Sequence, residues 1–452
     1  MANSYLNRSP SSAGNRKTWT WSGWVKFSQT PGAAGAILFS AYAHGNDNFK
    51  ISYGDTNQIS MRFYNGTEYQ LVPNRKFRDF SAWYHLLFAV DTTLATSGDR
   101  FKIYVNGVRE TSFANEDQPT QDLQMTINDT TTMQIGRYST GSNFFDGYMS
   151  HVSLVDGQAL TPTSFGQTDS TSGIWKFKSP SGLSWGTNGV HLKFENSGNL
   201  GLDSSGQTNN FTVNGNLKQS LDTPSNNHAT FNPIDKGKTG DMNFANGSTT
   251  TMNTSGFGDY GVRSSLGVTK GKWYWEIKIG SNTSQNAFAI LPMEDTLKFD
   301  MFGSTPEADL YGLQRQTDSA TNFYSNTTFT SGNTAWGGGI TSSDVIGFAL
   351  DMDNGKLYIS KNGTFKDLSG NTSNIGSGTY PTFTIANTSF TYALYVEMRT
   401  NDDNGLHINM GDGFFGTTAI SSAGSNGNGS LFEYDVPSGF YALNTKNLNT
   451  YG

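Results

Sequence analysis

The sequence predicts an all-β protein made of two tandem antiparallel β-sandwiches of the jelly-roll type. Three observations support this prediction. The 452 residues include 52 glycines, and Asn, Ser and Thr are abundant, which is typical of many short strands joined by tight turns. We find no helical periodicity of useful length. Aromatic residues make up 13% of a chain that is only 35% hydrophobic, so the cores must contain a few large side chains.

Two stretches with the same design, residues 83–108 and 344–364, suggest where each sandwich is centred. Each contains an apolar run that ends in one aspartate, then a second alternating run, and finally an Asn-Gly pair. Both residues of an Asn-Gly pair accept the positive φ of a type I′ turn, so the pair is a strong hairpin signal. We therefore predict one such hairpin in each sandwich, with Tyr104 and Tyr358 in matching positions.

The chain is too long for one core, and charge divides it into two parts. Residues 1–221 carry 17 Lys and Arg against 16 Asp and Glu, whereas residues 222–452 carry 13 against 21. The polar stretch 221–227 contains a proline and falls near this change. We predict domains at 1–221 and 222–452. Neither part has a basic stripe, so nucleic acid is not an expected partner.

Composition also limits the chemistry. The chain has no cysteine, which excludes disulfides and thiolate sites. No apolar run approaches ~18 residues, so we expect no membrane insertion. No signal peptide is visible at the N-terminus. The six histidines lack zinc-binding spacing, so no metal site is predicted from them. Calcium is left open, because residues 45–48 and 401–404 offer Asn and Asp side chains.

No catalytic residue is predicted. Glycoside hydrolysis needs two carboxylates that face one sugar. Asp351 and Asp353 have the spacing of one strand face, but Asn354-Gly355 follows them at once, and a turn explains this pattern better. The sequence also lacks a nucleophile elbow and a phosphate-binding glycine loop.

Four blocks in the first part resemble the laminin-G/concanavalin-A-like family, and four in the second part resemble the SPRY family. The first four are residues 21–26, 83–91, 104–107 and 145–155, and the second four are residues 268–279, 344–351, 357–363 and 408–411. Both resemblances imply β-sandwich binding modules rather than enzymes. The SPRY resemblance departs between residues 291 and 339.

Segments near residues 199–212 and 437–445 are similar to parts of tailed-bacteriophage virion proteins. This resemblance implies a tail fibre or appendage, located in the virion, that adheres to host surface glycans and contacts other virion proteins. Such fibres usually form trimers, although no heptad repeat supports a trimer here. Two alternatives stay open: a capsid-decoration or tail-assembly protein without a glycan ligand, and a polysaccharide-degrading enzyme, which the missing carboxylate pair disfavours.

Ligand binding needs aromatic side chains beside amide and carboxylate groups. Two candidate loops have this composition. We expect the acidic stretch 291–339 to be a long loop that makes the main contacts, with a neutral sugar or a virion protein. The predicted ligand-binding residues are Tyr42, His44, Asn46 and Asp47 in the first loop and Tyr311, Phe323, Tyr324 and Trp336 in the second.

Overall fold

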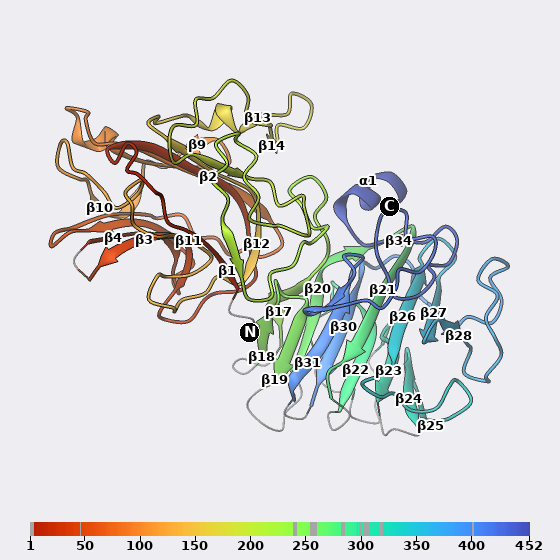
Figure 1. Ribbon diagram of the computed structural model, residues 1–452. Helices are drawn as coiled ribbons and strands as arrows, with labels where there is room; N and C mark the ends of the chain where they lie inside the picture. The colour runs from red at the N-terminus through yellow and green to blue at the C-terminus, as the bar shows by residue number, and fades with distance from the viewer. Residues whose placement is uncertain are drawn as a thin grey trace. The chain divides into compact units, whose positions relative to one another are not determined.

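The computed structural model describes residues 4–45, 47–237, 242–253, 260–281, 285–295, 297, 301, 308–315, 320–399 and 402–452 (Figure 1). The chain is 46% strand and 3% helical, which confirms the predicted all-β class. It divides into two compact units. The first unit is Met1–Gln219 with Thr223–Ser225, and the second unit is Ser220–Asp222 with Asn226–Gly452.

The first unit is a sandwich of two antiparallel sheets, which Figure 1 shows as two layers. The eight-stranded sheet has the order β10 (Phe113–Asp117), β6 (Glu68–Pro73), β5 (Ile59–Tyr64), β4 (Asp47–Tyr53), β3 (Ala36–His44), β11 (Met133–Ile135), β1 (Tyr5–Arg8) and β16 (Thr212–Asn214). The six-stranded sheet has the order β15 (Val190–Leu192), β12 (Gly147–Asp156), β2 (Thr18–Phe27), β7 (Trp83–Asp91), β8 (Phe101–Val105) and β9 (Val108–Arg109).

Large aromatic side chains fill the space between these two sheets. The ring centroids of Trp21 on β2 and Phe88 on β7 are 5.7 Å apart, and those of Trp19 on β2 and Phe49 on β4 are 5.1 Å apart. Fully burying a side chain of this kind stabilises a fold by roughly 2–3 kcal/mol. A few rings from each sheet therefore supply much of the core, as the composition predicts.

The second unit is also a two-sheet sandwich. Its seven-stranded sheet has the order β17 (Phe231–Lys236), β20 (Tyr260–Val268), β30 (Tyr392–Met398), β22 (Asn286–Pro292), β23 (Tyr311–Arg315), β24 (Thr321–Ser325) and β25 (Thr328–Asn333). Its nine-stranded sheet runs β18 (Met242–Ala245), β19 (Thr250–Asn253), β31 (Asp402–Asn409), β21 (Lys272–Ile279), β26 (Val345–Asp351), β27 (Lys356–Lys361) and β28 (Thr364–Phe365). The strands β29 (Phe383–Thr384) and β34 (Tyr441–Ala442) pair with β27 and β21.

Short elements complete both units. In the first unit β13 (Gly166–Thr168) pairs with β14 (Trp175–Phe177), and η1 (Ser97–Asp99) and η2 (Pro162–Ser164) are short 3₁₀ turns. In the second unit β32 (Phe414–Phe415) pairs with β33 (Thr418–Ala419), and the chain ends in the helix α1 (Thr445–Tyr451). Within the described residues, no helix is both long and apolar enough to span a membrane.

Both predicted Asn-Gly turns are present. Asn106 and Gly107 have φ values of 47° and 83°, and Asn362 and Gly363 have values of 50° and 75°. The turns link β8 to β9 and β27 to β28, at equivalent places in the two sheets.

The predicted match of Tyr104 and Tyr358 is wrong by two residues. Tyr104 lies two residues before its turn and pairs with Leu87, whereas Tyr358 lies four residues before its turn and pairs with Ala349. A shift of two preserves the face of the sheet, so both tyrosines still point away from the sandwich core.

The stretch 291–339 is not a long loop, which corrects the prediction. It contains β23, β24 and β25, which pair in sequence as the edge of the seven-stranded sheet. Tyr311, Phe323, Tyr324 and Phe329 lie on these strands, which explains their presence in this stretch. Phe299 and Phe302, which belong to the same predicted loop, lie outside the described residues.

Candidate functional site

One polar residue from each strand of the eight-stranded sheet falls on a single line across that sheet. The strand registers join the eight residues directly, each opposite the next. We call them the polar row. In order across the sheet, they are Thr212, Asn7, Gln134, Ser40, Lys50, Arg62, Gln70 and Asp117.

The alternation of each strand explains why the row faces outward. Phe49 and Ile51 flank Lys50 on β4, and Met61 and Phe63 flank Arg62 on β5, and all four apolar residues are buried in the core. Because successive side chains of a strand point to opposite faces, the polar residue between each pair must point away from the core. The outer face of the sheet is therefore a surface of amide, hydroxyl and charged groups.

Residues 137–145 fold across one part of this row. The backbone oxygen of Arg137 accepts a hydrogen bond from Ser40 Oγ at 3.0 Å, and Arg137 Nε donates to Gln134 Oε1 at 2.7 Å. Ser40 and Gln134 are consequently buried, whereas Lys50, Arg62 and Gln70 lie half-exposed beyond the covering segment. The open part of the row begins at Lys50.

Tyrosine rings border this open part. Tyr42 and Tyr138 meet edge to face with ring centroids 5.8 Å apart, and Lys50 Nζ lies 5.7 Å from the centroid of the Tyr138 ring. The guanidinium of Arg62 lies 5.2 Å from the ring of Tyr64. All three tyrosines are half-buried, so each ring is fixed at its base and leaves part of its surface in solvent. Aromatic rings fixed beside polar groups are what a sugar-binding surface requires.

Arg62 and Lys50 differ in how the protein neutralises them. Arg62 donates through Nε and Nη2 to Glu68 Oε2 at 2.9 and 2.6 Å, and through Nη1 to Asn48 Oδ1 at 3.1 Å. Burial and the neighbouring Arg62 lower the pKa of Lys50, and Glu68 offsets only part of that effect. Burial also raises the pKa of Tyr138, so its phenol is a hydrogen-bond donor at neutral pH.

The first predicted loop lies beside this surface. Tyr42 is part of it, and His44 is exposed at the end of β3. Asp47 begins β4 and is half-buried, and burial raises the pKa of its carboxyl group. Asn46 lies outside the described residues, as does Asn401, so both calcium candidates depend on undescribed positions. Elsewhere in the described part, no three His, Asp or Glu side chains form a metal-binding group.

The four residues predicted in the second loop are not surface groups. Tyr311, Phe323 and Trp336 belong to the main core of the second unit, and Tyr324 packs in a smaller cluster with Tyr395. All four side chains are at most 1% exposed. The four rings are therefore enclosed by the second unit and offer almost no surface to a ligand: Tyr311 and Phe323 pack in the main core, Tyr324 packs on the opposite face of β24, and Trp336 packs from the segment after β25.

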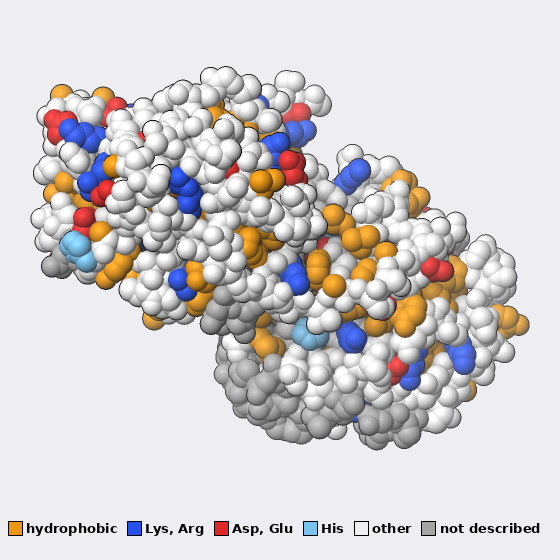
Figure 2. Space-filling view, in the orientation of Figure 1, with side chains coloured by type: hydrophobic (Ala, Val, Ile, Leu, Met, Phe, Trp, Pro, Cys, Tyr) orange, Lys and Arg blue, Asp and Glu red, His pale blue; other side chains and the backbone are white. Residues whose placement is uncertain are grey.

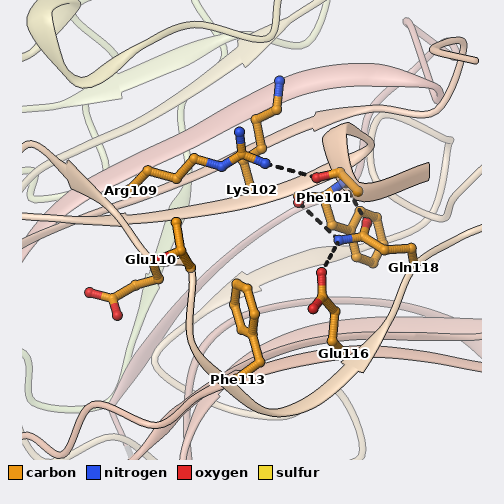
Figure 3. A pocket seen from close by; sticks show the side chains of 9 residues that line it. Phe101, Lys102, Arg109, Glu110, Phe113, Glu116 and Gln118 are labelled. Atoms are coloured by element: carbon orange, nitrogen blue, oxygen red, sulfur yellow. Dashed lines mark hydrogen bonds between the residues drawn. The ribbon is translucent and has the colours of Figure 1, made fainter. Parts of the chain in front are cut away.

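A concavity of about 160 Å³ also lies in the first unit, among η1, β8, β9 and β10 (Figure 3). Its lining carries the carboxylates Glu110 and Glu116, and Figure 3 shows them pointing in different directions. They do not face a common point, as two carboxylates that cleave a glycosidic bond would.

Three charged groups of this concavity, Lys102, Arg109 and Glu110, are already paired within the protein. Lys102 and Arg109 both lie near Asp99, at 3.5 and 3.2 Å. Glu110 accepts from Arg75 at 2.6 Å. Lys102, Arg109 and Glu110 are therefore engaged by neighbouring side chains of the same unit.

The sequence analysis named Tyr42 among its candidates for this surface but did not name Lys50, Arg62, Tyr64 or Tyr138. The alternation of polar and apolar residues in 50–53 and 59–64 predicts two strands with polar outer faces. This alternation does not show which strands are neighbours in the sheet. It also does not show that Tyr138, more than 70 residues further along the chain, lies beside them.

The space-filling view shows charged side chains of both signs scattered over one face, with no broad patch of Lys and Arg (Figure 2). This agrees with the absence of a basic stripe in the sequence.

Comparison with known proteins supports the fold of the first unit. Residues 2–164 match the family model of the concanavalin A-like lectin/glucanase superfamily, so this stretch is similar to domains with that β-sandwich fold. No match was found among curated proteins.

Solved structures resemble parts of the chain. The SPRY domain of human HERC1 is 17% identical, covers 39% of this chain and 96% of its own, and has a TM-score of 0.28. Domains LG4–5 of the mouse laminin α1 chain are 10% identical, with coverages of 89% and 85% and a TM-score of 0.28. Domain 4 of the arabinanase AbnA from Geobacillus stearothermophilus, solved with arabinotriose, is 20% identical, with coverages of 33% and 65% and a TM-score of 0.24.

Proposed function

We propose that the chain is a carbohydrate-binding adhesion protein and that it binds glycan on the outer face of the eight-stranded sheet. The polar row carries this proposal. A sugar presents hydroxyl groups that both donate and accept hydrogen bonds, together with apolar C–H faces. Lys50 and the phenols of Tyr42 and Tyr138 supply complementary groups and ring surface side by side.

The proposed activity is binding without turnover. Two carboxylates lie near the open part of the row. Glu68 accepts hydrogen bonds from Arg62, and Asp117 pairs with Gln70, two strands away from Arg62. Glu68 is thus engaged by Arg62, so Glu68 and Asp117 do not form a free carboxylate pair that faces one sugar. Without such a pair, a bound glycoside would stay intact.

We further propose that the protein works as a tail fibre or other appendage of a bacteriophage virion, where several copies would act together. The similarity of residues 199–212 and 437–445 to virion proteins supports this location. A single shallow face binds weakly, and linking copies raises avidity through effective concentration. The second unit would then contact other virion proteins, in line with its SPRY resemblance.

The test measures binding of the full chain to an array of bacterial surface glycans. The double variant Tyr42→Ala with Tyr138→Ala should lose at least about tenfold in affinity, because two rings leave the site. Tyr380→Ala is the matched control, since Tyr380 is an exposed tyrosine of the second unit. If no glycan binds, or if both variants behave like the parent, the proposal is wrong and the assembly role takes its place.

A further inference from the structure

We infer that the glycan carries a negative charge and that Lys50 is the residue that binds it. This inference rests on the proposed function of the outer face and names the class of sugar that the face accepts. It concerns one cation whose surroundings differ from those of its neighbours.

Lys50 has no counter-ion in the described part of the protein. Its Nζ forms no hydrogen bond or ion pair there, and its recorded contact is with the face of the Tyr138 ring. Other lysines of the first unit are paired with carboxylates: Lys17 with Asp122 at 3.0 Å and Lys176 with Asp169 at 2.9 Å. Within the described residues, Lys76 also lacks a recorded carboxylate partner, but it is exposed, whereas Lys50 is half-buried in the polar row.

The position of Lys50 makes this lack of a partner unfavourable for the unbound protein. Its ammonium is partly buried beside the guanidinium of Arg62, and both effects lower its pKa. Glu68, whose negative charge offsets part of these effects, is already bound to Arg62. An anion placed against Lys50 Nζ would therefore offset the free-energy cost of burying the ammonium and the repulsion between Lys50 and Arg62.

The neighbouring groups show how such an anion would be presented. The guanidinium of Arg62 is occupied by Glu68 and Asn48, so it cannot bind the ligand's anionic group through two parallel hydrogen bonds. Lys50 acts instead as a point charge with three donors. The rings of Tyr138 and Tyr42 stand beside it and supply surface for the body of the sugar.

The ligand class that fits is a sugar with one acidic substituent at the edge of its ring. A carboxylate of a uronic or other sugar acid and a sulfate ester share this chemistry. A neutral sugar would leave Lys50 without a partner and would bind less tightly.

The experiment measures affinity of the full chain for three matched probes: a hexuronic acid oligosaccharide, the corresponding neutral hexose oligosaccharide, and its O-sulfated form. We expect tighter binding of an acidic probe, with an affinity that falls as salt is raised. Comparison of the two acidic probes identifies whether carboxylate or sulfate is preferred.

Three variants make the test specific. Lys50→Met keeps the shape of the side chain without its charge and should lose roughly 10- to 100-fold in affinity for the acidic probe. Lys50→Arg should retain most of the affinity. Lys76→Met is the control, because Lys76 is an exposed lysine of the same unit away from the row. Unchanged thermal unfolding shows that each variant is folded.

The outcomes separate this inference from the function it rests on. Equal binding of neutral and acidic probes, or full affinity in Lys50→Met, overturns the inference. If the neutral probe alone binds and Tyr42→Ala weakens it, the proposed function stands while the inference fails. If none of the probes and no array glycan binds, the proposed function itself fails.

Discussion

Asn106 and Asn362 make the same pair of hydrogen bonds in the two units. The backbone N–H of Asn106 donates to His85 O at 2.9 Å, and its Oδ1 accepts from His85 N at 2.8 Å. Asn362 makes the corresponding bonds with Val345, at 2.8 and 2.9 Å. In each unit, one side chain therefore ties the turn to a residue near the start of the adjacent strand, His85 of β7 or Val345 of β26.

Replacing either asparagine with alanine should destabilise its own unit by roughly 1.5–3 kcal/mol. Alanine loses the side-chain hydrogen bond and is strained at a φ near +50°. Asn106→Gly and Asn362→Gly keep the backbone conformation and should cost about 1 kcal/mol. Hydrogen exchange of peptides from each unit measures the effect. Equal losses for alanine and glycine would contradict the role of positive φ.

Gly107→Ala should destabilise the first unit more than Gly66→Ala does. Both glycines have a positive φ, at 83° and 98°. A Cβ on Gly107 would lie 2.6 Å from the ring of Trp175, whereas a Cβ on Gly66 would meet nothing within 4 Å. Strain is common to both, so the difference isolates the packing of Trp175. Chemical denaturation of the two variants measures it, and equal stabilities would show that Trp175 can move aside freely.

The hairpins were predictable from the sequence, but the candidate site was only partly so. An Asn-Gly pair after an alternating run determines a local turn, because the φ requirement is local. The pairing of Ser40, Lys50 and Arg62 depends on strand order, which the alternation of one strand does not encode. The acidic and glycine-rich residues around Tyr311 and Trp336 are typical of a loop, and this pattern predicts exposed rings. The structure places both rings in the core of the second unit instead.

The first unit should lose stability as the pH falls from about 6.5. Burial lowers the pKa of His85 to about 3 and of His151 and His191 to about 4. The Nδ1 atom of His85 also accepts a hydrogen bond from Trp175 Nε1 at 3.1 Å, which requires an unprotonated nitrogen. An unfolded histidine titrates near 6.5, so below that pH the unfolded chain binds protons that the folded chain excludes.

The second unit should respond in the opposite direction. Burial raises the pKa of Glu276 to about 7, although the backbone N–H groups of Glu433 and Tyr434 donate to its carboxylate at 2.8 and 2.9 Å and restrain that rise. Its folded pKa lies above the ordinary value of 4.5. The resulting stabilisation is complete below about 4.5 and is lost as the pH rises through 7.

Hydrogen exchange between pH 5 and 7.5, corrected for intrinsic exchange rates, tests both directions in one sample. We expect protection of core peptides in the first unit to fall toward pH 5 and protection around Glu276 to rise. In Glu276→Gln, this pH dependence of the second unit should become smaller, with a remainder from Asp412, whose pKa burial raises to about 6, while the first unit keeps its own. A parallel change in both units would contradict the assignment of these groups.

Asp156→Ala should destabilise the first unit by about 3 kcal/mol or more. The buried carboxylate accepts hydrogen bonds from Asn15 N at 2.7 Å, Asn128 Nδ2 at 3.0 Å and Asn188 N at 3.0 Å. Alanine would leave buried donors without an acceptor, which is the costly case. Asp169→Ala is the control, because Asp169 receives several local hydrogen bonds at an exposed turn. Urea denaturation should show a small effect for Asp169→Ala and a large one for Asp156→Ala.

A structure of the full chain with its bound glycan tests the central claim most directly. We expect the sugar on the outer face of the eight-stranded sheet, with its acidic group at Lys50 Nζ and its ring against Tyr138 and Tyr42. A glycan found instead in the concavity beside Arg109 and Glu116, or on the second unit, would contradict the account.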